Sequence, residues 1–365
     1  MPPPLVLQLH RDRSGSTAET LFRFKLTVDQ LGISSVRVHT TARGRDVLQR
    51  YQQLLFTSVH TFDYQVHDVS CCHAPKHSPG GGEEVEEEVS RFLQQLPALR
   101  GDIRVLLSPV IPEGFGHGFS TRLGGVSSIP TLSSLNLFSS SLRRDPGAVV
   151  QENRRRLALH AGFHPRPLRL VKVDHGSDVW VLGKPEPQRY DSVVTDQRGQ
   201  VLAAPGADCM PILFADPGSK VIGAAHAGWK GTLMGVAMAT VGAMLTEFGC
   251  RASDIVVAVG PSVGGCCFTL DREQALDFLN LHPDCVPDPE AERPHVNIRL
   301  ANRYSTEFSW SAGGVLPGNI DDSSVSECTS CHPELFFSHV RDGPNFGTQL
   351  GFLWIKEEGE GGDEG

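Results

Sequence analysis

The chain has 365 residues, 39% hydrophobic and 21% charged, which predicts a globular protein with one large domain and a smaller one. No apolar run reaches the roughly 18 residues of a membrane-spanning helix, so we expect no membrane span. The net charge of −9 comes from two acidic runs, and the other residues include 32 acidic and 33 basic side chains. A near-neutral chain without a concentrated basic stripe predicts no nucleic-acid partner.

The N-terminal region alternates between strand-like and helix-like segments, which predicts a small α/β unit over residues 1–77. We expect strands at 4–9 and 35–39 and helices at 17–31 and 43–55. Residues 78–102 are predicted to form an acidic, glycine-rich linker, disordered near 78–88, with a short helix over 84–96 that Pro97 would end.

Residues 103–356 are predicted to form the main α/β domain, followed by a disordered acidic tail at 357–365. Helical spacing predicts helices at 149–161, 232–248, 271–281 and 296–308. Short apolar runs bounded by turn residues predict strands at 105–111, 168–173, 190–195, 201–204, 210–214, 221–225, 254–259 and 350–355.

Nine cysteines, an odd number, and an N-terminus without a basic segment before an apolar one predict a cytoplasmic chain with reduced thiols. Such thiols are available for metal binding or catalysis. Cys209 precedes the strand at 210–214, His226 follows the strand at 221–225, and His175 follows the strand at 168–173.

Three protein ligands with an open fourth position are typical of catalytic zinc. The same thiol and imidazoles could instead form a Cys–His nucleophile pair. Both interpretations of His175, Cys209 and His226 remain open at this level.

Two other metal groupings are disfavoured by the sequence. Cys328, Cys331 and His332 contain a C-x-x-C half-site for structural zinc, but a second pair is needed. The adjacent Cys266 and Cys267 have poor geometry for two ligands of one tetrahedral ion. The fifteen histidines include no His-x-His pair, which argues against a copper cluster.

The segments GFSTRLGG, HGSDVW, GADCMPILFADP, AAHAGWKG, GPSVGGCCF and CTSCHPELFFSHVRDG occur in this order. Over about residues 105–356 the chain thereby resembles the multi-copper polyphenol oxidoreductase family, also called laccase domain proteins. The resemblance implies a layered α/β sandwich shared with a Cys-His bacterial toxin deamidase. It also implies zinc held by His175, Cys209 and His226.

The activity that the resemblance implies is phosphorolysis of adenosine, inosine, guanosine and S-methyl-5'-thioadenosine, together with deamination of adenosine. The resemblance further implies a role in the purine metabolism of immune cells, a fatty-acid synthase partner, and association with peroxisomes through that partner. A scaffold for a lipid-synthesis partner and a thiol hydrolase using Cys209 are the alternatives.

Four further residues complete the predicted site. Arg122, Lys230 and Arg341 are candidates for binding phosphate or ribose, and Asp208 is a candidate for proton transfer or for a hydrogen bond to a metal ligand. Val340 stands where bacterial members of the family usually carry the first of two arginines.

Overall fold

A computed structural model describes residues 15–67, 82–140, 142–307 and 314–357. The strand expected at 4–9 and nearly all of the expected acidic tail lie outside these residues. No helix in the described part of the chain is long and apolar enough to cross a membrane.

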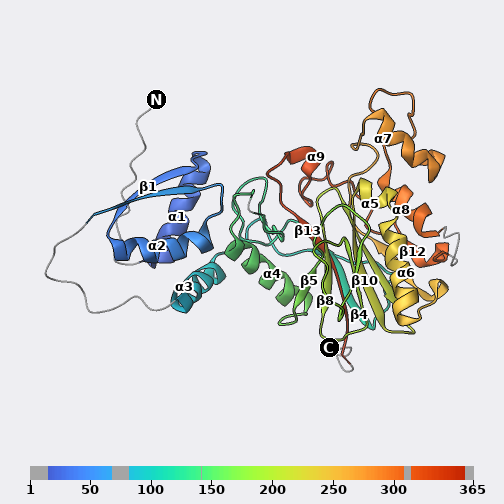
Figure 1. The fold of residues 1–365 in the computed structure, drawn as a ribbon, viewed down its shortest axis with the longest axis horizontal. Helices are drawn as coiled ribbons and strands as arrows, with labels where there is room; N and C mark the ends of the chain where they lie inside the picture. The colour runs from blue at the N-terminus through green and yellow to red at the C-terminus, as the bar shows by residue number, and fades with distance from the viewer. Residues whose placement is uncertain (1–14, 68–81, 141, 308–313, 358–365) are drawn as a thin grey trace.

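The N-terminal unit places helices against a two-stranded parallel sheet and packs at one end of the larger body of the molecule (Figure 1). Its elements are α1 (Thr17–Gln30), β1 (Ser35–Thr40), α2 (Ala42–Leu55), β2 (Thr61–Val66) and α3 (Gly82–Gln95). The predicted helices at 17–31 and 43–55 and the strand at 35–39 are confirmed. Strand β2 has no predicted counterpart.

The acidic run before residue 89 is helical, so the expectation of a disordered linker is wrong for residues 82–88. Val85, Val89 and Leu93 recur on one face of α3 and are buried in the N-terminal hydrophobic cluster. The carboxylate of Glu88 accepts hydrogen bonds from the Ala18 backbone N–H, at 2.9 Å, and the Tyr51 hydroxyl, at 2.5 Å. Burial of this apolar stripe outweighs the repulsion among the exposed glutamates on the opposite face.

The larger body is a sandwich of two mixed sheets, as the resemblance implied. The six-stranded sheet has the order β12-β11-β9-β10-β7-β6, and the five-stranded sheet has the order β3-β4-β13-β8-β5. Their facing sides share a buried cluster that includes Phe119, Leu213 and Leu353. The strands are β3 (Val105–Leu106), β4 (Phe115–Ser120), β5 (Leu168–Leu170), β6 (Val179–Val181), β7 (Ser192–Thr195), β8 (Val201–Gly206), β9 (Met210–Asp216), β10 (Val221–Ala227), β11 (Val256–Val259), β12 (Ile320–Asp321) and β13 (Gln349–Ile355).

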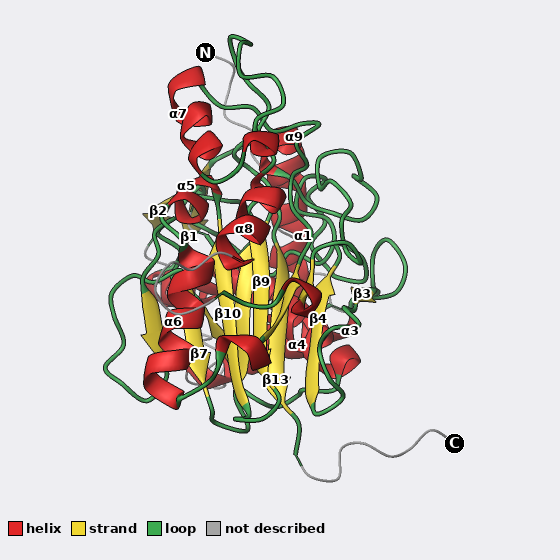
Figure 2. Ribbon diagram, turned by 90° about the vertical axis from the view of Figure 1, so that its right-hand side faces the viewer, coloured by secondary structure: helices red, strands yellow, loops and turns green. Residues whose placement is uncertain are grey.

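Helices cover both outer faces of the sandwich. Figure 1 and Figure 2 show α6 and α8 over the six-stranded sheet, while α4 lies on the side of the five-stranded sheet and faces the N-terminal unit. Leu157 and Ala158 of α4 pack on Val201 and Phe352. These helices are α4 (Gly147–Ala161), α5 (Trp229–Leu233), α6 (Val236–Phe248), α7 (Arg272–Leu276), α8 (Ile298–Glu307) and α9 (His339–Asp342).

Several predicted elements are shorter than expected. The helix predicted at 232–248 is divided, because Gly235 adopts a left-handed conformation with φ of 75° between α5 and α6. The helix predicted at 271–281 is α7 followed by a 3₁₀ turn at Asp277–Asn280. The strand predicted at 105–111 ends at Leu106, and strand β4, which follows it, was not predicted.

Candidate metal centre

Antiparallel pairing of two strands brings Cys209 and His226 together. Cys209 immediately precedes β9, and His226 is the penultimate residue of β10, where it lies opposite Pro211. His175 comes from the loop between β5 and β6. Helix α5 starts just after β10, so the three residues lie at the end of the sandwich where Figure 1 shows α5 and α9.

The three side chains converge as predicted. One ligand atom from each of His175, Cys209 and His226 lies within 4.8 Å of the others. The two imidazole rings are nearly perpendicular, at 80°, with centroids 5.1 Å apart. His226 is buried, Cys209 is half-buried and His175 is exposed. The group therefore has one closed side and one side open to a ligand.

Asp191 fixes both histidine-bearing segments. Its Oδ1 lies 2.8 Å from Nδ1 of the His226 ring, and its own backbone carbonyl accepts the His226 N–H at 2.7 Å. The carboxylate also accepts backbone N–H bonds from Asp174, His175 and Gly176 at 2.8–3.1 Å. A carboxylate behind the second ring nitrogen is the usual way to orient a metal-binding histidine.

The sequence analysis missed Asp191, which carries no motif of its own. The signal that could have identified it is a lone carboxylate inside the apolar strand predicted at 190–195, directly before the observed β7, where burial demands several hydrogen-bond partners.

The charges and hydrogen bonds around Cys209 favour a thiolate. Burial raises the pKa of Cys209, but the His226 charge and hydrogen bonds from both histidines outweigh it and lower the pKa to about 6. Burial lowers the pKa of His226, but the Cys209 thiolate and Asp191 outweigh it and raise the pKa to about 9. A thiolate is the form that binds metals and that acts as a nucleophile.

Gly228 leaves room for the three donor groups. A Cβ at this position would lie 3.0 Å from Sγ of Cys209 and 3.1 Å from Cδ2 of His175. Only glycine leaves that space free. His175 itself has a φ of 60°, a conformation that non-glycine residues seldom adopt and that is often found at functional sites.

The donor set fits a borderline-soft divalent cation. One thiolate and two imidazoles are ligands that zinc accepts in catalytic sites, and the exposed side leaves a fourth position for substrate. Asp191 supplies the outer hydrogen bond that such sites require. The residues present therefore match a mononuclear metal site.

Arg122, predicted to bind phosphate or ribose, is hydrogen-bonded to the backbone of its own surroundings. Its side chain is buried over the Phe337 ring, and its guanidinium donates to the backbone carbonyls of Ser133, Pro333 and Pro130. These three bonds use part of the five guanidinium donors, and the role of Arg122 in binding phosphate or ribose stays a prediction.

Arg341 is occupied in a similar way. It donates to the carbonyls of Thr329 and Phe336 and pairs with the carboxylate of Asp342. Its place beside the site remains a prediction, but its donors hold the 329–336 segment.

Asp208 and Lys230 differ in whether their charged groups have hydrogen-bond partners. Asp208 accepts hydrogen bonds from Oγ1 of Thr329, at 2.7 Å, and from the backbone N–H of Val340, at 2.6 Å. It therefore anchors two loops beside Cys209. Lys230 is exposed, with Nζ 5.3 Å from the Trp229 ring centre, and within the described residues its ammonium group forms no hydrogen bond or ion pair.

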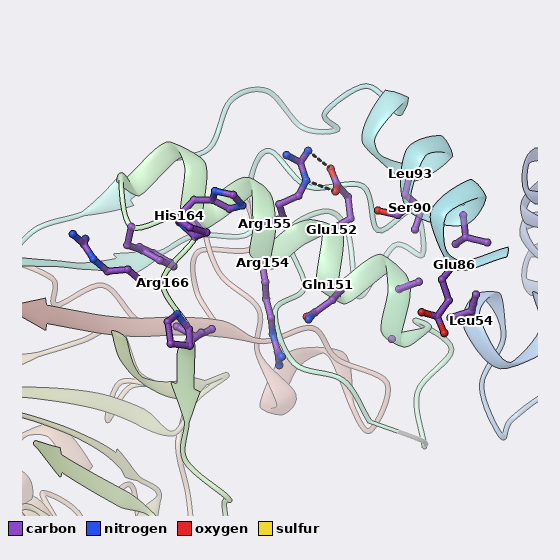
Figure 3. A pocket seen from close by; sticks show the side chains of 18 of the residues that line it. Leu54, Glu86, Ser90, Leu93, Gln151, Glu152, Arg154, Arg155, His164 and Arg166 are labelled. Atoms are coloured by element: carbon purple, nitrogen blue, oxygen red, sulfur yellow. Dashed lines mark hydrogen bonds and ion pairs between the residues drawn. The ribbon is translucent and has the colours of Figure 1, made fainter. Parts of the chain in front are cut away.

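A cleft of about 710 Å³ lies away from these residues, between α4 and helices of the N-terminal unit. Figure 3 shows Glu86 and Ser90 of α3 on one side and the Arg155–Glu152 ion pair of α4 on the other. The cleft contains none of His175, Cys209 or His226, so this cleft and the candidate metal centre are separate features.

Comparisons with known proteins identify the family of this chain. The family described as multi-copper polyphenol oxidoreductase laccase matches residues 116–356. The purine nucleoside phosphorylase LACC1 of Mus musculus is 50% identical over 352 residues, covering 93% of this chain and 80% of that protein. The purine nucleoside phosphorylase YlmD of Geobacillus stearothermophilus is 35% identical over 254 residues, covering 66% of this chain and 90% of that protein.

Solved structures agree in fold. The crystal structure of YlmD from Geobacillus stearothermophilus superimposes with a TM-score of 0.62 at 32% identity, covering 70% of this chain and 98% of that one. That of the Bacillus licheniformis protein YfiH gives the same TM-score at 28% identity, covering 72% and 98%. The chain belongs to the multi-copper polyphenol oxidoreductase laccase family.

Proposed function

We propose that this protein is a zinc-dependent purine nucleoside phosphorylase. The observation that carries the proposal is the convergence of His175, Cys209 and His226 within 4.8 Å, in a chain half identical to a protein named purine nucleoside phosphorylase. The open side of this group gives a substrate access to the donor atoms.

The proposed reaction joins a purine nucleoside and phosphate. A phosphate oxygen attacks the anomeric carbon while the bond from that carbon to the purine nitrogen breaks. The base leaves with the bonding electrons and takes up a proton, which gives free base and ribose 1-phosphate. The ribose carries cationic character in the transition state, so the enzyme must hold an anion close to it.

Each residue of the site has a distinct part in this proposal. His175, Cys209 and His226 would hold zinc, which supplies a Lewis acid when bound. Asp191 keeps the His226 ring oriented. Lys230, which is exposed two residues after Gly228, attracts phosphate to the open side.

The finer activities belong to the same proposal. We propose that adenosine, inosine, guanosine and S-methyl-5'-thioadenosine are substrates, and that the site also deaminates adenosine. The fatty-acid synthase partner, the peroxisomal association and the role in immune cells stay predictions from the family resemblance.

A thiol hydrolase is a second candidate that one observation favours. Cys209, His226 and Asp191 form a chain of thiol, imidazole and carboxylate, with 2.8 Å between His226 Nδ1 and Asp191 Oδ1. Such a chain can activate a nucleophile. His175 has no part in that chemistry. Its position close to Cys209 and His226 therefore supports a metal site over a thiol hydrolase.

The experiment incubates the purified protein with adenosine, with and without phosphate, and identifies products by mass. Adenine with ribose 1-phosphate, formed only with phosphate, supports phosphorolysis, whereas inosine formed without phosphate supports deamination. A strong chelator should abolish both. Unchanged turnover in the chelator would favour the thiol hydrolase, and no turnover by zinc-loaded protein would contradict the proposal.

A further inference from the structure

A group of four cysteines lies at the same end of the sandwich as the candidate metal centre. Strands β11 and β12 are parallel neighbours, with Val257 opposite Ile320. The loops that follow them therefore leave the sheet at the same end. The first loop carries Cys266 and Cys267, and the second carries Cys328 and Cys331.

Backbone bonds hold these two loops side by side. Ser262 and Cys328 form a parallel bridge, and the Thr329 N–H donates to the Ser262 carbonyl at 3.1 Å. A tight turn follows in the first loop, where the N–H groups of Cys267 and Phe268 both donate to the Gly264 carbonyl. This turn gathers both adjacent cysteines near the second loop.

The sulfur atoms are spaced as ligands of one ion would be. Sγ of Cys266 lies 3.7 Å from that of Cys267 and 3.8 Å from that of Cys331, while Cys267 and Cys331 are 3.3 Å apart. All four sulfurs lie within 4.8 Å of one another. A tetrahedral zinc with four bonds of about 2.3 Å requires sulfurs about 3.8 Å apart. A disulfide needs about 2.05 Å, so these four are free thiols.

Gly264 makes the close approach of the loops possible. A Cβ there would lie 3.2 Å from Sγ of Cys266 and 3.2 Å from Cβ of Cys328. Its N–H points at Sγ of Cys328, 3.2 Å away. Backbone N–H bonds to cysteine sulfur stabilise the thiolate that a metal needs. The adjacent cysteines, which the sequence analysis considered poor ligands, therefore lie on one side of a glycine turn that faces Cys328.

We propose that Cys266, Cys267, Cys328 and Cys331 form a structural zinc site, separate from the candidate metal centre. Four thiolates close the coordination shell and leave no position for substrate, so this site stabilises rather than reacts. Cys328 is buried, whereas Cys266 and Cys331 are exposed, which gives the ion a path of entry from solvent.

The proposed ion would brace the residues beside the candidate metal centre. Thr329, next to Cys328, donates to the Asp208 carboxylate, and Val263, in the first loop, donates to the Asp208 carbonyl at 3.1 Å. Both cysteine-bearing loops are therefore hydrogen-bonded to Asp208, the residue that precedes Cys209. A zinc ion bound to the four cysteines would maintain these hydrogen bonds by preventing the loops from separating.

Metal content tests the proposal on the full chain. Wild-type protein purified with zinc and reductant should contain about two zinc ions per chain, and the Cys266→Ser/Cys331→Ser variant about one. His226→Gln should also contain about one zinc ion, because it loses the ion of the candidate metal centre and keeps the ion held by the four cysteines. Cys250→Ser, which changes a buried thiol outside both groups, should keep about two. Circular dichroism must show that each variant is folded.

Cobalt substitution assigns the remaining ion. Tetrahedral cobalt with four thiolates gives strong sulfur-to-metal absorption, which His226→Gln should retain and the single variant Cys331→Ser should lose in large part. Equal zinc content in wild-type and Cys266→Ser/Cys331→Ser protein would overturn the proposal. A mass lower by about 2 Da for each disulfide formed among these cysteines, and restored by reductant, would overturn it as well.

Discussion

The carboxylate of Asp191 contacts the segments of both histidines in the candidate metal centre. It faces the His226 ring and accepts three backbone N–H bonds from residues 174–176, while its own side chain is fully buried. The side chain of Asp191 therefore positions two of the three proposed metal ligands, His175 and His226. Such outer partners typically contribute 10–100-fold to metal affinity, roughly 1–3 kcal/mol.

Asp191→Asn should weaken zinc binding by about 10–100-fold and lower turnover, because an amide NH₂ would face N–H groups that need an acceptor. Zinc retention during titration with a chelator measures the effect. Asp145→Asn is the matched control, since Asp145 is also buried and accepts bonds from Ser127 and Asn136 elsewhere in the fold. Equal loss of zinc from both variants would mean that Asp191 acts through general stability.

Lys230→Gln should raise KM for phosphate about fivefold with little change in kcat, because an exposed charge about 4 Å from phosphate contributes about 1 kcal/mol. Steady-state kinetics at varied phosphate concentration measure it. Lys184→Gln removes an exposed lysine that pairs with Glu247, and it should leave KM unchanged. An unchanged KM in Lys230→Gln would remove Lys230 from the phosphate site.

At the scale of elements, the candidate metal centre depends on the turn from β10 into α5. Gly228 caps α5 with φ of −78° and ψ of 174°, a conformation that alanine adopts without strain. The space beside it, in contrast, is filled by Cys209 and His175. The need for glycine at this position therefore comes from the donor groups and not from the backbone.

Gly228→Ala should fold but lose most of its zinc and activity, because the new methyl group would displace the Cys209 sulfur. Gly242→Ala, in the middle of α6 with open space around it, should keep its zinc and gain about 0.5–1 kcal/mol of stability. Metal analysis and thermal unfolding of the two variants provide the comparison. Full zinc content in Gly228→Ala would show that the site tolerates the methyl group.

Local sequence signals predicted the central strands and the three donors, but not the partners that long-range topology supplies. The runs at 210–214 and 221–225 are continuous and apolar, and they became β9 and β10. Strand β4 was not predicted, because its Phe-Gly-His-Gly sequence resembles a turn. Only the pairing of β11 with β12 brings the four cysteines together, and spacing along the chain does not reveal that pairing.

Residue type does not reveal what a buried arginine binds in this chain. Arg156, on α4, pairs with Glu152 through its guanidinium and donates to the carbonyl of Leu96, just beyond α3. Arg122 likewise satisfies backbone carbonyls. A guanidinium offers five donors and can serve buried carbonyls as well as anions, so residue type did not distinguish these roles.

At the scale of the whole molecule, Asp29 connects the N-terminal unit to the sandwich. Its carboxylate pairs with Lys25 at 2.6 Å, with His60 at 2.9 Å and with Arg144, from the larger body, at 2.9 Å. The side chain of Asp29 is 6% exposed, so these pairs are poorly screened by solvent. Burial raises the pKa of Asp29, but the His60 hydrogen bond, the Lys25 charge and the Arg144 hydrogen bond outweigh it and lower the pKa to about 2.

A lowered carboxyl pKa stabilises the fold above the unfolded value near 3.8, and the effect disappears as the pH falls towards 2. Wild-type protein should therefore exceed Asp29→Asn in stability by about 1–2 kcal/mol at pH 6, after allowance for screening. The difference should shrink between pH 4 and pH 2. Urea unfolding across this range measures it, and a constant difference down to pH 2 would show that the carboxylate charge is not the cause.

The most direct test of the central claim is phosphate-dependent release of adenine from adenosine, measured with zinc content for wild type and Cys209→Ser. Serine is nearly isosteric, so the fold should survive while zinc is weakened and adenine release falls at least about tenfold. Wild-type activity should disappear in chelator and return with zinc. Full zinc occupancy and full turnover in Cys209→Ser would show that Cys209 is neither ligand nor nucleophile, and would contradict the account.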